Sequence, residues 1–372
     1  VNKYALEDLQ YGMDNMPRIR PNQSAHIGAV TAFSAATLAA KFHLNEGNYN
    51  KVEELTNDII ANGGFSLYPD YYQLWKIPGK LCDESIFECQ CTDFGNSSGD
   101  LIDADQWFVC QGPQNSGSNI NGWGDCGILK PFRDWAYDRG ETVRATTSFL
   151  FADSTTPDDD YIKPQSNPNN TDCWNGKAYT PLSQLTPGRT KYGTNNNIRI
   201  FRYADVLLMY AEAKIEGGDI DPSVSDAINR VRARAYGVNR EETESYPAVT
   251  TQDKDELRKI IRFERRMEFA FEGLRYMDLI RWKIAEKALN TRMYGMLDPE
   301  PLIENVVKKG LWFFPGIPAI DENGIADFSG MAGTGLIKLL AERKFDANKQ
   351  YLWQIPTKEI LINENLKQNP GY

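Results

Sequence analysis

Two helix pairs, separated by a long non-helical stretch, constrain the fold of this chain more than any other feature. Residues 27–62 contain an apolar helix, a turn at Gly47 and a second striped helix, and residues 198–235 repeat this design around Gly218. Apolar residues that recur every three or four positions predict helices that each bury one face. The pairs are too far apart for a tandem array, so we expect them to meet in space across an inserted segment.

Composition divides the chain into four parts. Residues 1–92 read as a helical scaffold, residues 93–197 as an irregular lobe rich in Gly, Asn, Ser, Asp and Pro, residues 198–290 as the second pair followed by an Arg- and Glu-rich helix, and residues 291–372 as a loop-rich C-terminal segment. Each helix pair is similar to a tetratricopeptide unit. We therefore predict a mainly α fold, a single domain in which a tetratricopeptide-type helical scaffold carries an irregular loop-rich lobe.

The irregular lobe contains half of the eight tryptophans, namely Trp107, Trp123, Trp135 and Trp174. Disordered segments are poor in aromatic residues, so this density indicates an ordered lobe built from loops. Loops held on a rigid scaffold are where binding sites concentrate. The lobe is therefore the first place to look for function.

Charge and hydropathy exclude several classes of partner. The net charge of −10 argues against nucleic acid, whose phosphates require basic patches, and against an anionic membrane surface. No apolar run approaches the ~18 residues of a membrane helix. The chain begins without Met or a signal peptide, inside what reads as a helix over residues 1–16. We expect a processed or truncated chain whose targeting signals lie outside these residues.

One Arg- and Glu-rich helix invites a catalytic interpretation. Glu264 and Glu268 lie one helical turn apart on the apolar stripe, and two neighbouring carboxylates are what a glycosidase uses as its acid and nucleophile. Nearby guanidinium groups favour ionised carboxylates, which opposes a general acid; these arginines are Arg262, Arg265, Arg266 and Arg275. Hydrolase, zincin and P-loop motifs are absent, and there are two histidines. We predict structural ion pairs and no catalytic residues.

No motif calls for a cofactor. Asp100, Asp103 and Asp105 are the candidate ligands for a structural calcium ion, but their spacing is not that of an EF-hand, and we expect an exposed acidic turn. The run from Asp158 to Asp160 is expected to be a solvated charge run. Six cysteines are compatible with disulfides, and their spacing matches no zinc motif.

The lobe tryptophans offer a sugar-binding chemistry. Sugar rings present apolar C–H faces that stack on aromatic planes, while nearby amides hydrogen-bond the hydroxyl groups. Trp123 stands between two glycines and follows Asn121, and Trp174 and Tyr179 flank another Asn-Gly pair. The candidate ligand-binding residues are Trp123, Trp107, Trp174, Tyr179 and Asn121.

The opposing interpretation is that these aromatics form the core of the lobe, which is the more common fate of any single tryptophan. We expect that at least one of them contacts ligand. The remaining tryptophans, Trp75, Trp282, Trp312 and Trp353, are expected to lie in the core of the scaffold.

The end of the chain, residues 352–372, reads as a strand-like stretch, a short helix capped by Thr357 and a type II turn closed by Gly371 and Tyr372. This ending resembles the C-terminal signature of the SusD/RagB family of outer-membrane nutrient-binding lipoproteins. Further blocks resemble the family in the same order, so the resemblance covers nearly the whole chain; they are residues 30–67, 83–88, 122–139, 202–234 and 264–282.

The resemblance implies a protein without catalytic activity at the extracellular face of the outer membrane, active in starch or glycan utilisation. Such a protein binds oligosaccharide or polysaccharide and passes it to a SusC-like TonB-dependent transporter. Its only membrane attachment is a lipidated N-terminal Cys. Family members usually carry well over a hundred further N-terminal residues, including this anchor, which are missing here. Two alternatives stay open: a binder of peptide or another nutrient within the same family, and, less favoured, a glycoside hydrolase.

Overall fold

In the computed structural model, the described residues form two compact units, residues 1–272 and residues 273–372. The described residues are 2–92, 105, 107–113, 122–124, 126–128, 130–163, 173–185, 194–290, 292–296, 319–323, 325–327, 337–342 and 344–372. Helices dominate, and every sheet among these residues has two strands, so the predicted mainly α fold is confirmed. The four-part division made from composition stays a prediction.

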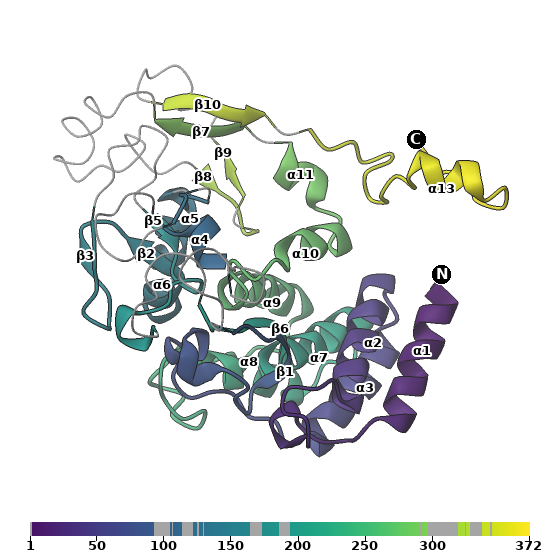
Figure 1. Ribbon diagram of the computed structural model, residues 1–372, viewed down its shortest axis with the longest axis horizontal. Coiled ribbons are helices and arrows are strands. Elements are labelled where there is room, and N and C mark those ends of the chain that lie inside the picture. Colours follow the sequence, from purple (N-terminus) through teal and green to yellow (C-terminus); the bar gives the residue numbers. More distant parts are fainter. Residues whose placement is uncertain are drawn as a thin grey trace. The chain divides into compact units, whose positions relative to one another are not determined.

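The scaffold of the first unit is helical (Figure 1). Its helices are α1 (Asn2–Asn15), α2 (Ala32–Glu46), α3 (Tyr49–Asn62), α7 (Tyr203–Gly217), α8 (Pro222–Ala235) and α9 (Lys254–Glu268). Gly47 and Gly218 end α2 and α7 in the left-handed conformation, which glycine adopts without a steric penalty. Both predicted pairs therefore form, and α3 packs directly against α7, so the pairs meet in space as expected.

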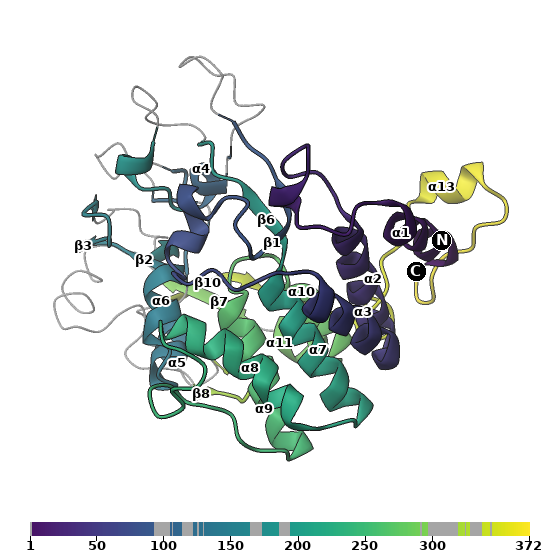
Figure 2. The ribbon, with the colours of Figure 1, turned by 90° about the horizontal axis from the view of Figure 1, so that it is seen from below.

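A two-stranded sheet marks where the chain leaves the scaffold and returns to it. Strand β1 (Ser85–Cys89) pairs antiparallel with β6 (Ile198–Arg202), and Figure 2 shows them side by side. The lobe of residues 93–197 begins after β1 and ends before β6. Both ends of the inserted segment are thus fixed to the same sheet, which limits the freedom of the lobe at its base.

The described part of the lobe combines short helices with short strands. These are α4 (Trp107–Gln111), α5 (Lys130–Asp138), α6 (Thr142–Ser148), β2 (Phe149–Phe151), β3 (Ser154–Thr155), β4 (Tyr161–Ile162) and β5 (Cys173–Asn175). Strand β2 pairs with β5 and β3 with β4. A buried cluster of Leu150, Ile162, Trp174, Ala178 and Tyr179 fills the space beneath them. The expectation of an ordered, aromatic-rich lobe is confirmed for these residues.

Short 3-10 helices complete the first unit at Pro21–Gln23, Gln73–Trp75, Ile77–Gly79 and Leu182–Gln184. Helix α9 ends at Glu268, and Phe271 follows it with a φ of 67°. A side chain at positive φ cannot continue a right-handed helix, so the chain leaves the helical path before Phe271.

The second unit contains α10 (Arg275–Arg281), α11 (Ala285–Leu289) and α13 (Thr357–Ile362). Strand β7 (Arg292–Met296) pairs with β10 (Ile337–Glu342), and β8 (Ala319–Ile320) with β9 (Ala326–Asp327). Its core cluster consists of Leu279, Ala285 and Phe345. None of the helices in the described part of the chain is long and apolar enough to span a membrane.

The end of the chain differs from its prediction in one detail. Helix α13 begins at Thr357, its N-cap is Pro356, and no side chain caps it, so Thr357 is not the cap. The closing turn forms with Gly371 at a φ of 89° and a hydrogen bond from Tyr372 N to the Asn369 carbonyl. Positive φ at this position is what a type II turn requires and glycine permits.

Candidate functional site

Glu264 and Glu268, the carboxylates of the rejected catalytic interpretation, are fully buried and ion-paired. Glu268 Oε1 accepts hydrogen bonds from Arg202 and Arg234, both at 2.6 Å. Burial alone would raise the pKa of Glu268, but Arg234, Arg202 and Arg144 outweigh it and hold that pKa well below its usual range. A carboxyl group in this state carries no proton to donate to a leaving group.

Segments distant in sequence supply partners for these carboxylates. Glu264 accepts from Arg144 at 2.6 Å and from Arg232 at 2.7 Å, and Arg144 comes from the lobe while Arg232 comes from α8. Proximity in sequence pointed to arginines such as Arg265 of the same helix, and Arg265 pairs with Asp205 of α7. The ion pairs are structural, as predicted, and they include partners that sequence proximity did not suggest.

These pairs belong to one buried network, which we call the central ion network. It joins five carboxylates (Glu84, Glu141, Glu264, Glu268, Glu272) to five cations (Arg144, Arg202, Arg232, Arg234, Lys177). Two of the cations come from the lobe. Lys177 donates to Glu272 and to the Glu268 carbonyl, both at 2.7 Å, and burial lowers its pKa to about 8. The network therefore fastens the lobe to the scaffold.

A third lobe contact uses a buried lysine of the scaffold. Lys76 donates to the carbonyls of Gly176 and Tyr179 at 2.7 and 2.6 Å, and its ammonium group lies 4.8 Å from the ring centres of Tyr72 and Tyr179. Burial holds the pKa of Lys76 well below its usual range. Together with the central ion network, this contact attaches residues 176–179 of the lobe to the scaffold.

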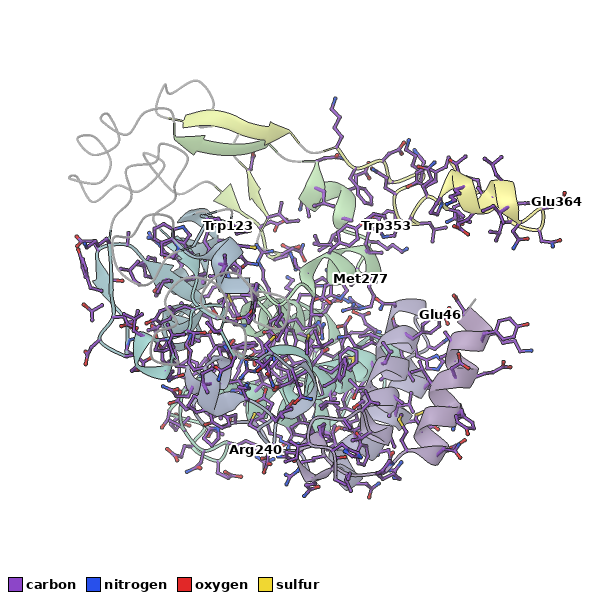
Figure 3. All side chains as sticks on the ribbon, viewed as in Figure 1. Glu46, Trp123, Arg240, Met277, Trp353 and Glu364 are labelled. Carbon is purple, nitrogen blue, oxygen red and sulfur yellow. The ribbon has the colours of Figure 1, made fainter. Side chains whose placement is uncertain are left out.

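Trp123 is the predicted ligand-binding residue that the structure leaves accessible. It is 49% exposed, and Figure 3 labels it within the lobe. Three backbone hydrogen bonds hold its segment: Gly122 N to the Pro113 carbonyl, Trp123 N to the Val109 carbonyl and Gly124 N to the Gly112 carbonyl, at 2.7 to 2.9 Å. A Cβ on Gly122 would lie 2.6 Å from the Gly112 carbonyl oxygen, so this close approach requires glycine.

Helix α4, to which the Trp123 N–H is hydrogen-bonded, begins with Trp107. This tryptophan is partly buried and packs against the aromatic cluster of the lobe. Asp105 precedes it, accepts the Trp107 N–H at 2.7 Å and forms an isolated antiparallel bridge with Thr194. Gln111, at the end of the helix, accepts from Asn175 at 2.8 Å. The segment that carries Trp123 is thus hydrogen-bonded to a helix that is itself anchored at both ends.

The acidic residues of this region have a different role from the one expected. Asp105 is almost fully buried, and burial raises its pKa to about 6, so the expected exposed acidic turn is wrong at this residue. Asp100 and Asp103 lie outside the described residues. Within the described residues, no group of three metal-ligating side chains comes together.

Asp158 and Asp160 accept hydrogen bonds from the hydroxyl groups of Tyr72 and Tyr179, respectively. The expected solvated charge run is therefore wrong for these two aspartates, which hold aromatic side chains in place. Their acceptor role is local to the lobe and its junction with the scaffold.

Trp174 and Tyr179 are excluded from the site by burial. Each is 1% exposed and belongs to the core cluster of the lobe, so neither ring has a face for a ligand, and their assignment as ligand-binding residues is wrong. Asn121 lies outside the described residues. Of the five candidates, Trp123 is exposed and Trp107 is partly buried against the core cluster of the lobe.

Of the tryptophans expected in the scaffold core, one is buried and another is exposed. Trp75 is buried, as expected, whereas Trp353 is 76% exposed, so its assignment to the core is wrong. Trp282 is partly exposed, and Trp312 lies outside the described residues. Among the cysteines, Cys173 is buried, whereas Cys89 and Cys126 are exposed.

The family model described as the SusD family matches residues 125–372. A SusD-like protein of Bacteroides ovatus is 24% identical over 330 residues, 78% of this chain and 52% of the relative. SusD-like protein P2 of Formosa agariphila is 25% identical over 391 residues, 99% of this chain and 64% of the relative. The chain thus spans between half and two thirds of the length of these relatives.

Solved structures share the fold over the full length of this chain and about 70% of theirs. A SusD homolog of Bacteroides thetaiotaomicron superposes with a TM-score of 0.70 at 21% identity, covering 100% of this chain and 70% of that one. Surface glycan-binding protein A of Bacteroides fluxus gives 0.67 at 23%, covering 100% and 69%. A laminarin-binding SusD-like protein gives 0.66 at 20%, covering 100% and 68%.

Proposed function

The chain belongs to the SusD family, and from that membership we propose that it binds oligosaccharides or polysaccharides by stacking a sugar ring on Trp123. In this proposal the protein acts at the extracellular face of the outer membrane, held there in its full-length form by a lipid anchor. It performs no chemistry on the glycan and delivers it to a SusC-like TonB-dependent transporter.

The observation that carries the proposal is the half-exposed Trp123 ring on a fixed backbone. Three backbone hydrogen bonds and a glycine-dependent close approach hold the segment in place. A ring whose backbone is already ordered loses little conformational entropy when a ligand binds. An indole held in this way is a ready stacking surface for the apolar face of a sugar.

The named relatives support a glycan as the ligand. One structural neighbour is named as a surface glycan-binding protein and another as a laminarin-binding protein. The proposal brings this property to the present chain on the strength of the shared family and the exposed ring. Acidic or phosphate-rich ligands are less compatible with a net charge of −10.

The electrostatics of Glu264 and Glu268 support binding without catalysis. Both are fully buried behind guanidinium groups, and the pKa of Glu268 is lowered. A glycosidase needs one carboxyl group with a raised pKa next to an accessible partner. This pair has the opposite properties, so we expect bound glycan to remain uncleaved.

Affinity electrophoresis tests the proposal directly. Native gels containing laminarin, starch or xylan should retard the wild-type protein, and Trp123→Ala should reduce the retardation at least tenfold in apparent affinity, about 1.4 kcal/mol. Tyr11→Ala, which removes an exposed aromatic ring from α1, is the matched control and should behave as wild type.

Three results would contradict the proposal. Retardation that is unchanged in Trp123→Ala would remove this residue from the site. Failure of the wild-type protein to bind any polysaccharide of the panel would favour the peptide-binding alternative. Release of reducing sugar that is lost in a folded Glu264→Gln variant would restore the hydrolase.

A further inference from the structure

The second unit contains a pocket that neither the sequence motifs nor the Trp123 site explains. It encloses about 330 Å³, within the usual range for small-ligand pockets. Its lining consists of Tyr276, Leu289, Lys344, Phe345, Gln350, Leu352, Trp353 and Tyr372. We propose that it is a second sugar-binding subsite, with Trp353 as its stacking platform. The inference rests on the proposed function in one respect, namely that the ligand is a glycan.

Trp353 has the exposure of a ligand-binding ring. Its side chain is 76% exposed, and Figure 3 labels it beside the partly exposed helix α10, which contributes Tyr276. The Tyr276 and Trp353 rings lie 6.0 Å apart between centres at 61°. An edge-to-face contact of this kind orients the indole while leaving its face open.

The backbone around Trp353 is fixed although its side chains are exposed. Gln368 makes two hydrogen bonds to Ile355, at 2.9 Å each. Asn369 donates to the Trp353 carbonyl at 2.6 Å, and the Tyr372 hydroxyl donates to the Leu352 carbonyl at 3.0 Å. These four hydrogen bonds, all made by side chains near the end of the chain, order residues 352–355, which are largely exposed. Such ordering before binding is what lowers the cost of capturing a ligand.

Polar side chains also line this pocket. Lys344 and Gln350 line it and can donate hydrogen bonds to hydroxyl groups, and Tyr276 adds a phenol. Lys349 lies over the Tyr372 ring, 5.6 Å from its centre, and so holds that ring from one side. An aromatic floor with a few convergent polar groups is the composition expected of a site for a neutral sugar ring.

The lining favours a sugar over a protein partner. The most exposed aliphatic side chains of the second unit, Leu361 and Ile362 on α13, are not among the residues that line the pocket. A protein interface would use such aliphatic side chains together with Trp353 as one apolar patch. A sugar would contact the aromatic pocket alone. Binding of a sugar therefore depends on Trp353 and not on Leu361 or Ile362, whereas binding of a protein would depend on all three.

Oxidation mapping tests the subsite with the wild-type protein. N-bromosuccinimide oxidises accessible indoles, and peptide mass spectrometry locates the products. With a laminarin oligosaccharide, or with whichever glycan of the panel the protein binds, oxidation of Trp353 should slow several-fold. Protection of Trp123 without protection of Trp353 would overturn the second subsite and leave the proposed function intact. Protection of neither, with every glycan, would overturn the proposed function itself.

Variants supply an independent readout. Trp353→Ala should weaken retention by polymeric glycan about tenfold, because two linked subsites on one polymer reinforce each other, whereas Trp353→Phe should retain most of it. Leu361→Ala, equally exposed but outside the pocket, is the matched control and should bind as wild type. A loss in Leu361→Ala equal to that in Trp353→Ala would assign the surface to a protein partner and contradict the inference.

Discussion

The centre of the first unit buries charged side chains, whereas the rim of its lobe, the segment around Trp123, exposes an aromatic one. At the centre, five carboxylates and five cations are buried in the central ion network. At the rim, Trp123 keeps half of its indole in solvent. Charged residues are ordinarily the exposed ones and tryptophan is ordinarily well buried. In this protein, the buried charges hold the lobe on the scaffold, and the exposed ring is free to bind.

The contrast separates the residues that hold the structure from the residue that we propose as the ligand-binding one. Intact buried ion pairs add little net stability, but removing one partner leaves an uncompensated charge in the interior. An exposed ring adds little to stability either, and its removal leaves nothing unpaired. The two regions should therefore respond to mutation in different assays, the centre in unfolding and the rim in binding.

Removing a carboxylate from the centre should have the largest effect. Glu268→Ala removes one of the two carboxylates that Arg202 and Arg234 share and leaves buried positive charge less compensated, so we expect a loss of about 3–5 kcal/mol in the free energy of unfolding. Urea denaturation measures it. Glu54→Ala, which breaks the exposed pair with Lys51, is the control and should cost less than ~1 kcal/mol. Equal effects of the two substitutions would mean that the network is not buried as described.

Trp174 provides the same test inside the lobe. Trp174→Ala opens a cavity in the aromatic cluster and should cost about 3–5 kcal/mol, which urea denaturation or limited proteolysis of the lobe will detect. If Trp174→Ala instead lost glycan binding while retaining wild-type stability, the assignment of Trp174 to the core would be wrong.

The buried Asp105 should make the stability of the protein depend on pH. Its pKa is raised by burial from 3.8 to about 6. Between about pH 4 and pH 6 the folded protein retains a proton that the unfolded chain has released, so the Asp105 contribution to stability falls as pH rises through this window and stays low above it. Asp105→Asn keeps an oxygen to accept the Trp107 N–H and should stabilise the protein at pH 7 by about 1–3 kcal/mol.

The measurement is the free energy of unfolding at pH 4, 6 and 8 for both proteins. The two curves should converge at pH 4 and separate as pH rises to 6. Parallel curves over the whole range would show that Asp105 titrates normally and is not buried as a charged group.

Trp123→Ala should have the smallest effect on folding. Surface substitutions away from special features usually change stability by less than ~0.5 kcal/mol. The melting temperature should therefore match wild type, while retention by glycan falls. A large loss of stability would mean that the ring is part of the lobe core and would remove the reason for assigning it to a binding site.

The sequence predicted the scaffold better than the site. Helix pairs follow from local periodicity, and glycines at Gly47 and Gly218 end helices by a local conformational preference, so both were accessible from the sequence. The ion-pair role of Glu264 was also predictable from nearby arginines. Its actual partners, Arg144 and Arg232, depend on how distant segments pack, and sequence proximity gave no information about them.

The tryptophans show even more clearly that local sequence does not reveal how distant segments pack. Trp123 and Trp174 both follow or precede Asn and Gly in the sequence, yet one is half exposed and the other is buried. The difference comes from the β2–β5 pairing that carries Trp174 into the core, which local composition does not encode. For Trp353, the sequence did contain a usable signal. The amide side chains of Gln368 and Asn369 hydrogen-bond to the backbone of the segment that contains Trp353, so this segment is ordered by polar contacts and its tryptophan can stay exposed.

The most direct test of the separation between centre and rim follows the tryptophan indole N–H signals by NMR during titration with a glycan that the protein binds. We expect the Trp123 signal, assigned through Trp123→Phe, to shift in proportion to occupancy, while the signals of the buried Trp75 and Trp174 stay in place. Saturation of binding with the Trp123 signal unmoved would contradict a binding role for Trp123.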